Sequence, residues 1–436
     1  MKHHFTAAIS MLAVVTAAPA FAQTEIQWWH AMTGANNDVV NKLAADFNAT
    51  QSEFKVVATY KGSYADTLNA GIAAFRAGNA PHIMQVFEVG TATMMAAKGA
   101  IKPVQEMMKE AGESFDPKSY LPAITGYYST AKGEMLSFPF NSSTMVMWVN
   151  KDALKKANIA DVPKTWPEVF EAGKKLKAAG YDKCGFTAAW SPWALVEQFS
   201  AWHNVPMGTK ANGLDGFDTE MKFNSPTHVK LLTDLVNLQK DKIYDYSGRA
   251  NENEGRFTSG ECPIMLTSSG FFGNVKANAK FEFTSALMPY YPDVAGAPQN
   301  SIIGGASLWV MGGKSAAEYK GIAKFFTFLS DTDRQAKLHI ESGYLPITKA
   351  AYDTVKASGF YTQNPDRETP IKSLTNKEPT ENSRGLRFGN MVQIRDMISE
   401  ELENALAGKK TPKQALDDAT SRANATLRQF ERTAGR

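Results

Sequence analysis

"TEIQWWHAMTGANNDVVNKLAADFNATQSEFKVVATYKGSYADTLNAGIAAFRAGNAPHIMQVFEVG" (residues 24–90) alternates strand-like and helix-like patterns. The runs at 24–29, 54–60 and 82–88 are rich in apolar, β-branched and aromatic residues, which is typical of strands. Between them, apolar residues recur at helical spacing: Val39, Leu43 and Phe47, then Leu68, Ile72 and Phe75. This order predicts an α/β fold with a mainly parallel sheet and crossover helices.

The acid Glu88 stands where the third predicted strand ends. In open α/β sheets, ligands lie beyond the carboxyl ends of the strands. We therefore expect Glu88 and the segment from Tyr60 to Tyr64 to face a binding site.

The N-terminal segment MKHHFTAAISMLAVVTAAPAFA (residues 1–22) has one lysine, an apolar stretch and small residues at Ala20 and Ala22. This pattern predicts a secretory signal peptide that is cleaved after Ala22. The alternative, a membrane anchor, is disfavoured because the apolar stretch is shorter than the roughly 20 residues of a spanning helix. We expect an exported, soluble protein that begins near Gln23.

Removal of 22 of the 436 residues leaves 414, more than one hydrophobic core usually organises, so two lobes are expected. Pro139, inside an apolar run, suits a crossover between them. The expected N-terminal lobe comprises residues 23–138 and about 293–345, and the expected C-terminal lobe comprises about 139–292 and 346–436. Within the second lobe, ECPIMLTSSGFFGNV (261–275) predicts a strand, a turn and a helix.

Gly304 and Gly305 interrupt the strand pattern NSIIGGASLWVMGG (300–313). Such a pair marks either a close approach by another group or a β-bulge, and the stretch alone does not distinguish the two.

The charge and the cysteines make several functions unfavourable. The formal net charge of +3 becomes +2 without Lys2, and the charges are interspersed, so nothing indicates nucleic-acid binding. The two cysteines, Cys184 and Cys262, are expected to form one disulfide within a lobe of an exported protein. A thiol nucleophile or a metal site is the less favoured alternative, because neither C-x-x-C nor nearby histidine spacing is present.

No catalytic signature is complete. The seven histidines lack metal-binding spacing, GASLW (305–309) has Trp309 where a nucleophile elbow needs glycine, and GGKS (312–315) lacks the first glycine of a P-loop. We therefore expect no enzyme, no metal and no cofactor.

Aromatic, hydroxyl and glycine residues gather instead at predicted strand ends, as in a site for a polar small molecule. They are Trp28, Trp29, His30, Tyr60, Tyr64, Asn141, Ser142, Ser143, Thr144, Trp190, Trp193, Ser268, Ser269 and Gly270.

Several longer motifs, spread over nearly the whole chain, resemble the sn-glycerol-3-phosphate branch of the periplasmic solute-binding proteins. They are TYKGSYADTLNAGIAAFRAGNAP (59–81), QVFEVGTATMM (85–95), FNSST (140–144), QNSIIGGASLWVM (299–311), SGYLPITKAAYD (342–353) and RGLRFGNMVQIR (384–395). The resemblance implies two α/β lobes, each with a mainly parallel sheet flanked by helices, that close on glycerol 3-phosphate or a glycerophosphodiester such as glycerophosphocholine. It also implies delivery to the permease of an ATP-binding-cassette importer.

The resemblance also implies a set of ligand-binding residues: Tyr64, Glu88, Ser143, Ser269, Gly305, Tyr344 and Arg395. The paired serines of FNSST and TSSG leave the choice between neighbours open. The match around AAWSPWALVEQF (188–199) implies that Trp190 and Trp193 are walls of the cleft.

Charge complementarity suggests the roles of two of these residues. We expect Arg395 to bind the phosphate and Glu88, which the phosphate would repel, to bind the glycerol hydroxyls. The alternative for Arg395 is a surface salt bridge with Asp396, Glu400 or Glu401. Two other functions stay open, an oligosaccharide- or polyol-binding protein and an extracytoplasmic phosphodiester hydrolase.

Overall fold

The computed structural model describes residues 23–434, and the predicted signal peptide with its cleavage site lies outside the described residues. The strands are β1 (Thr24–His30), β2 (Phe54–Tyr60), β3 (Ile83–Phe87), β4 (Ile101–Lys102), β5 (Phe138–Asn150), β6 (Phe186–Ala188), β7 (Ile264–Ser268), β8 (Phe283–Ala286) and β9 (Ile303–Met311).

Helices flank these strands. In the first third of the chain they are α1 (Gly34–Thr50), α2 (Tyr64–Arg76), α3 (Thr91–Ala96), α4 (Val104–Glu110) and α5 (Pro122–Tyr128). The middle third holds α6 (Lys151–Lys156), α7 (Trp166–Ala178), α8 (Phe199–Trp202), α9 (Thr209–Gly213), α10 (Pro226–Lys240), α11 (Glu254–Thr258) and α12 (Phe272–Asn278). The last third holds α13 (Ala316–Leu329), α14 (Thr332–Ser342), α15 (Lys349–Ala357), α16 (Phe360–Gln363), α17 (Thr369–Leu374), α18 (Met391–Leu406) and α19 (Pro412–Ala434).

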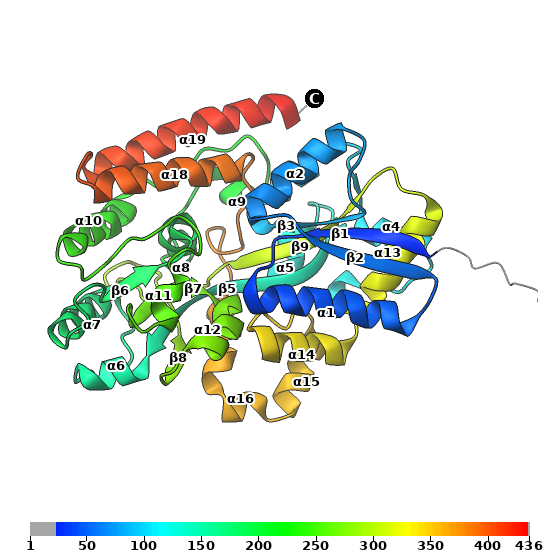
Figure 1. Ribbon diagram of the computed structural model, residues 1–436. Coiled ribbons are helices and arrows are strands. Elements are labelled where there is room, and N and C mark those ends of the chain that lie inside the picture. Colours follow the sequence, from blue (N-terminus) through cyan, green and yellow to red (C-terminus); the bar gives the residue numbers. More distant parts are fainter. Residues whose placement is uncertain (1–22, 435–436) are drawn as a thin grey trace, which may run out of the picture.

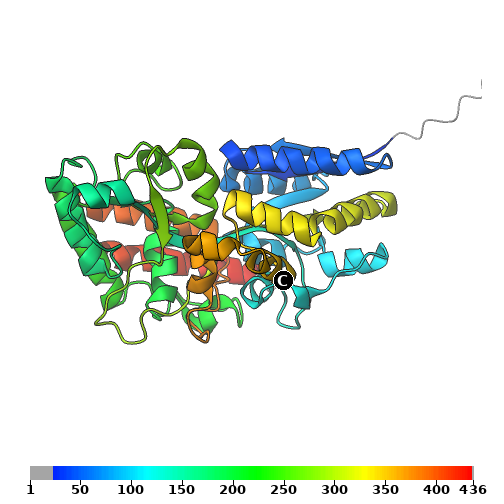
Figure 2. The same ribbon diagram turned by 90° about the horizontal axis from the view of Figure 1, so that it is seen from below.

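Two lobes lie side by side in both views (Figures 1 and 2). The N-terminal lobe is built on the sheet β2-β1-β3-β9-β5, in which β1 pairs in parallel with β2 and β3. The C-terminal lobe is built on β5, β7 and β6, with β8 on the other side of β5. Within residues 23–434, no helix is long and apolar enough to span a membrane.

Strand β5 belongs to both sheets. Its first half, up to Thr144, pairs with β9, and its second half, from Met145, pairs with β7. Pro139 lies inside this strand, next to a register shift between Pro139 and Asn141, on the edge of the N-terminal sheet. An edge position with a bulge tolerates proline because no ladder hydrogen bond has to be donated there. The chain therefore crosses between the lobes along a continuous strand.

The two-lobed α/β class is confirmed, but the sheets are mixed rather than mainly parallel. The first three strands are parallel, as predicted, whereas β9 runs antiparallel to β3 and β5, and β5 runs antiparallel to β7 and β8. The reason is that β5 carries the chain out of the N-terminal lobe and β9 carries it back, so these two neighbouring strands run in opposite directions. The predicted lobe boundaries stay predictions, since buried clusters contain residues from both sides of them.

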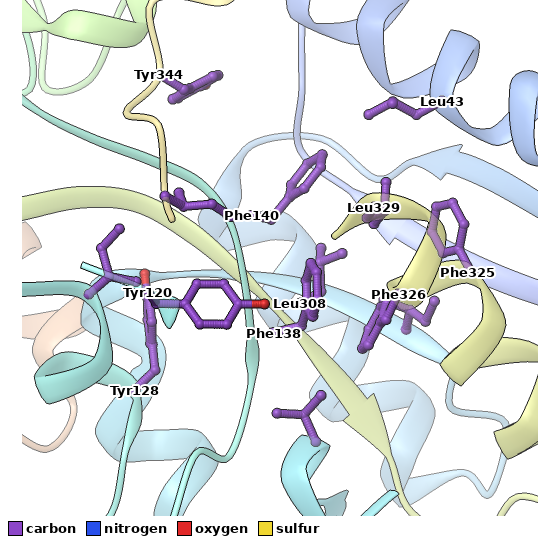
Figure 3. Packing of buried hydrophobic residues seen from close by; sticks show 14 of the residues in the cluster. Leu43, Tyr120, Tyr128, Phe138, Phe140, Leu308, Phe325, Phe326, Leu329 and Tyr344 are labelled. Carbon is purple, nitrogen blue, oxygen red and sulfur yellow. The ribbon is translucent and has the colours of Figure 1, made fainter. Parts of the chain in front are cut away.

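The core of the N-terminal lobe is aromatic. Phe138 of β5 stacks on Phe326 of α13, with ring centroids 4.5 Å apart (Figure 3). The neighbouring Phe325 contacts Trp28 of β1. Trp28 and Phe325 are fully buried. Trp28, which the sequence analysis grouped with cleft residues, is thus a core residue.

Local signals explain several helix starts. Ser63 and Asp66 form a capping box at the start of α2, which fixes Tyr64 at the first turn. The stretch GGKS, which partly matches a P-loop, ends at another helix cap: Ser315 and Glu318 form the capping box of α13.

Cys184 and Cys262 form a disulfide within the C-terminal lobe, as the sequence predicts.

Candidate functional site

A cavity of about 240 Å³ lies between the lobes, beyond the ends of β1, β3 and β7. Its lining residues from the N-terminal lobe include Met32, Asn36, Tyr60, Ser63, Tyr64, Phe87, Glu88, Ser143 and Gly305. Those from the C-terminal lobe and the last third of the chain include Trp190, Trp193, Asn251, Glu252, Glu254, Ser268, Gly270, Asn274, Tyr344 and Arg395.

The structure brings together most of the residues predicted for the site. Tyr64, Glu88, Ser143, Gly305, Tyr344 and Arg395 all line the cavity, as do Trp190 and Trp193. Ser269 does not line it; this residue is buried, and its Oγ accepts the backbone N–H of Thr144 at 3.4 Å. Its neighbour Ser268 lines the cavity instead. Of the other grouped aromatic residues, Trp29 and His30 do not line it.

Arg395 lies between two buried carboxylates. Its Nη2 donates to Glu88 Oε1 at 2.5 Å, and Nε and Nη2 donate to Glu197 Oε1 and Oε2 at 2.6 and 2.7 Å. Glu88 and Glu197 are 5% and 1% exposed. These partners exclude a surface salt bridge for Arg395; Glu400 and Glu401 pair with Arg422 instead.

The electrostatics of this cluster are dominated by burial and by the two acids. Burial lowers the pKa of Arg395, but Glu197 and Glu88 outweigh it and raise that pKa above its usual value. The pKa of Glu88 is raised by burial and by Glu197, against the opposing pull of Arg395. The guanidinium therefore stays charged, with two carboxylates competing for it.

The direct contact between Arg395 and Glu88 contradicts their predicted separation at opposite ends of a ligand. Each is at hydrogen-bonding distance from the other, so a phosphate on this face of the guanidinium would lie against Glu88 and Glu197. The spacing of residues in the sequence could not show that they meet.

Neutral hydrogen-bonding groups line the same cavity. Tyr64 stacks on Phe87, with ring centroids 5.3 Å apart, and its OH accepts Nδ2–H of Asn141 at 2.9 Å. Burial raises the pKa of Tyr344 to about 12 and that of Tyr64 well above its usual value. Both phenols therefore remain protonated near neutral pH and can donate a hydrogen bond to an anion.

The glycine pair of β9 permits close approach by other groups. A Cβ at Gly304 would lie 2.3 Å from the Trp193 ring, and one at Gly305 would lie 2.0 Å from the carbonyl oxygen of Asn141. Gly305 also has φ of +83°, in the left-handed region. The pair thus lets Trp193 and strand β5 reach the cavity wall.

Sequence reasoning missed Glu197, Glu252 and Glu254. Glu197 lies in a π-helical turn (Trp193–Gln198) that also carries the cavity residue Trp193. Such turns are frequent at functional sites, but their pattern does not differ from that of an α-helix in a single sequence. The polar run NENE (251–254), which contains Glu252 and Glu254, was the available signal for the other two.

Within residues 23–434, no group of three or more His, Cys, Asp or Glu residues could hold a metal ion. Hydrogen-bonding and aromatic side chains line the cavity.

Relatives of the chain cover nearly its whole length. The sn-glycerol-3-phosphate-binding periplasmic protein UgpB of Brucella abortus (strain 2308) is 52% identical over 418 residues, which are 95% of this chain and 96% of the relative. The protein of the same name from Escherichia coli (strain K12) is 48% identical over 433 residues, 99% of this chain and 98% of the relative.

Solved structures share the fold at lower identity. UgpB from Mycobacterium tuberculosis in complex with glycerophosphocholine has a TM-score of 0.76 at 20% identity, and covers 93% of this chain and 99% of its own. The maltose-bound MalE3 of T. maritima has a TM-score of 0.76 at 18% identity, and covers 92% of this chain and 99% of its own. The sequence pattern of the bacterial extracellular solute-binding proteins matches residues 42–369. The chain belongs to this family of bacterial extracellular solute-binding proteins.

Proposed function

We propose that this protein captures sn-glycerol 3-phosphate, or a glycerophosphodiester such as glycerophosphocholine, in the periplasm. It then delivers the ligand to the permease of an ATP-binding-cassette importer. The observation that carries the proposal is the inter-lobe cavity, which joins neutral donors to the charged cluster of Glu88, Arg395 and Glu197. The names of relatives about half identical to this chain support the same ligand class.

In this proposal the phosphate binds among the neutral donors. Tyr64, Ser143, Ser268, Tyr344 and the backbone N–H of Gly305 supply uncharged hydrogen-bond donors, which suit phosphate oxygens. The buried Nε1–H of Trp193 adds a donor that has no acceptor within residues 23–434. The walls of Trp190 and Trp193 cover the C–H side of the ligand.

The glycerol hydroxyls bind at Glu88 and Arg395. A carboxylate accepts hydrogen bonds from hydroxyls, and the guanidinium of Arg395 orients Glu88. In this arrangement the phosphate contacts neutral donors rather than the two carboxylates.

Calorimetric titration with glycerol 3-phosphate, glycerophosphocholine and maltose, side by side, tests the ligand class. We expect heat from the first two and none from maltose. Saturable binding of maltose alone would favour the oligosaccharide-binding alternative.

Delivery rather than turnover is the second part of the proposal. We expect no release of choline from glycerophosphocholine over hours, because the cavity holds no arrangement recognised for hydrolysis. Steady choline release that depends on the protein would favour the hydrolase.

Closure is the third part. Because cavity residues come from both lobes, ligand contacts are complete only when the lobes are closed. Small-angle X-ray scattering should show a smaller radius of gyration with saturating glycerol 3-phosphate than without it. An identical profile would contradict a hinge.

A further inference from the structure

Glu254 is a cavity residue without a cationic partner. Its Oε1 accepts the Thr267 hydroxyl at 2.9 Å, and it accepts a second hydrogen bond from the Trp190 side chain. Within residues 23–434, no lysine, arginine or histidine nitrogen lies within 4 Å of its carboxylate, in contrast to Glu88. Glu254 is thus a half-buried carboxylate in the cavity whose hydrogen-bond partners are neutral side chains.

The backbone around Glu254 is held firmly. The adjacent Asn253 donates its Nδ2–H to Thr187 Oγ1 and to the Ala188 carbonyl, each at 3.0 Å. Trp190, whose backbone N–H donates to the Ala250 carbonyl at 2.7 Å, has φ of +55°. A bulky residue in the left-handed region is an outlier that persists only where its surroundings enforce it, and such residues cluster at binding sites. The Glu254 side chain therefore projects from a segment of the cavity wall that hydrogen bonds hold in place.

The charged groups around Glu254 do not favour its ionised form. Glu252 is a second carboxylate on the same segment as Glu254. Tyr344, from the loop after α14, interacts electrostatically with Glu254. The nearby cations are bound elsewhere: Arg249 to Glu403, Arg256 to Asp245 and Glu261, and Arg395 to Glu88 and Glu197. On α12, Lys276 lies over the Phe272 ring. Burial, aided by Glu252, raises the pKa of Glu254 to about 7.

We propose that Glu254 is a ligand-binding residue that takes up one proton from solvent when an anionic phosphate occupies the cavity, and donates the resulting O–H to a phosphate oxygen. The proposal rests on the proposed function, since it needs a phosphate among the donors near Tyr344. An ionised Glu254 would repel that phosphate. A neutral carboxylic acid is a hydrogen-bond donor instead, and a buried site can hold it in this form.

The direction of the pH dependence follows from proton uptake. The protonated form binds, so affinity is highest below pH 7 and falls as pH rises, by up to tenfold per unit, because free Glu254 must be protonated first. Glycerol 3-phosphate has its own second pKa near 6. Glycerophosphocholine, a phosphodiester without ionisation near neutral pH, isolates the contribution of the protein.

The test is calorimetric titration with both ligands at pH 8, in buffers that differ in ionisation enthalpy. The slope of the observed heat against buffer enthalpy counts protons taken up per ligand bound. With glycerophosphocholine we expect close to one proton for wild type at pH 8 and close to none at pH 5.5, where Glu254 is already protonated. Binding at pH 8 without proton uptake would overturn the proposal, whereas absence of any binding would overturn the proposed function.

Two variants assign the proton to its residue. Glu254→Gln keeps the shape and a donor, so it should bind both ligands at pH 8 without proton uptake and with nearly equal affinity from pH 6.5 to 8.5. Glu252→Gln removes a negative charge from the same segment but leaves the Glu254 carboxyl, so uptake should persist. Uptake that persists in Glu254→Gln would show that another group takes the proton. The wild-type measurement needs no variant and stands even if a substitution impairs folding.

Discussion

Arg395 Nη2 lies 2.5 Å from Glu88 Oε1, although the two residues are 307 positions apart in the chain. Glu88 begins the short 3-10 turn after β3, and Arg395 lies in the first turns of α18 (Figure 1). Glu197, from the π-helical turn, holds the same guanidinium. The contact therefore joins three segments at the cavity and links ligand binding to the packing of the lobes.

Removal of the guanidinium should destabilise the protein. Arg395→Ala leaves Glu88 and Glu197 buried without their cation, which costs about 3–5 kcal/mol for a broken buried pair. Urea unfolding measures the loss. The control is Arg384→Ala, since Arg384 forms a 3.8 Å contact with Asp215 in which both side chains are exposed, and exposed pairs contribute about 1 kcal/mol or less. Equal unfolding midpoints for wild type and Arg395→Ala would contradict a structural role of the cluster.

Glu88→Gln should weaken binding selectively. The glutamine side chain keeps the shape of the glutamate but replaces one acceptor oxygen with a donor. The binding free energy for glycerol 3-phosphate should therefore become less favourable by about 1–3 kcal/mol. The loss should be smaller for an analogue that lacks one glycerol hydroxyl. Calorimetry of both ligands tests this, with Tyr344→Phe as the comparison, because loss of a phosphate donor should weaken the two ligands alike. Equal losses for both ligands in Glu88→Gln would contradict the assignment of ends.

Gly305→Ala should disrupt the cavity wall. The new Cβ would lie 2.0 Å from the Asn141 carbonyl oxygen, and the residue would keep φ of +83°. Gly313, just past the opposite end of β9, is a matched control, because it has φ of +76° but open space around a Cβ added there. Gly313→Ala should cost about 1–2 kcal/mol from the left-handed conformation alone. Gly305→Ala should cost clearly more in unfolding free energy and should lose ligand affinity; similar behaviour of the two variants would show that the close approach is unimportant.

Loss of the disulfide should destabilise the C-terminal lobe. Cys184 and Cys262 enclose a loop with a sequence separation of 78, for which chain entropy predicts about 4.5 kcal/mol. The double variant Cys184→Ala/Cys262→Ala should unfold at correspondingly lower urea concentration. Peptide mass spectrometry without reduction should show the two half-cystines linked in exported protein. Two free thiols there would contradict the pairing.

The sequence by itself determined the class of fold and about half of the residues that line the cavity. Strand β2 and the starts of α2 and β3 follow from patterns that are local: hydrophobic periodicity, a capping serine at Ser63 and the proline at Pro81. Glu88 was predicted as a site residue because a strand end is visible in the sequence. Local interactions act between neighbours in the chain, so one sequence can reveal them.

Only the tertiary structure decided the strand directions and the partners of the charged groups. The antiparallel course of β9 depends on where the chain returns from the second lobe, over 150 residues after β5 begins. The pairing of Arg395 with Glu88 and Glu197 depends on distances between segments remote in sequence. So does the lack of a cationic partner for Glu254 among residues 23–434. Electrostatic energies at close range change steeply with the separation and the burial of the charged groups. For groups on remote segments, neither the separation nor the burial can be read directly from the order of residues.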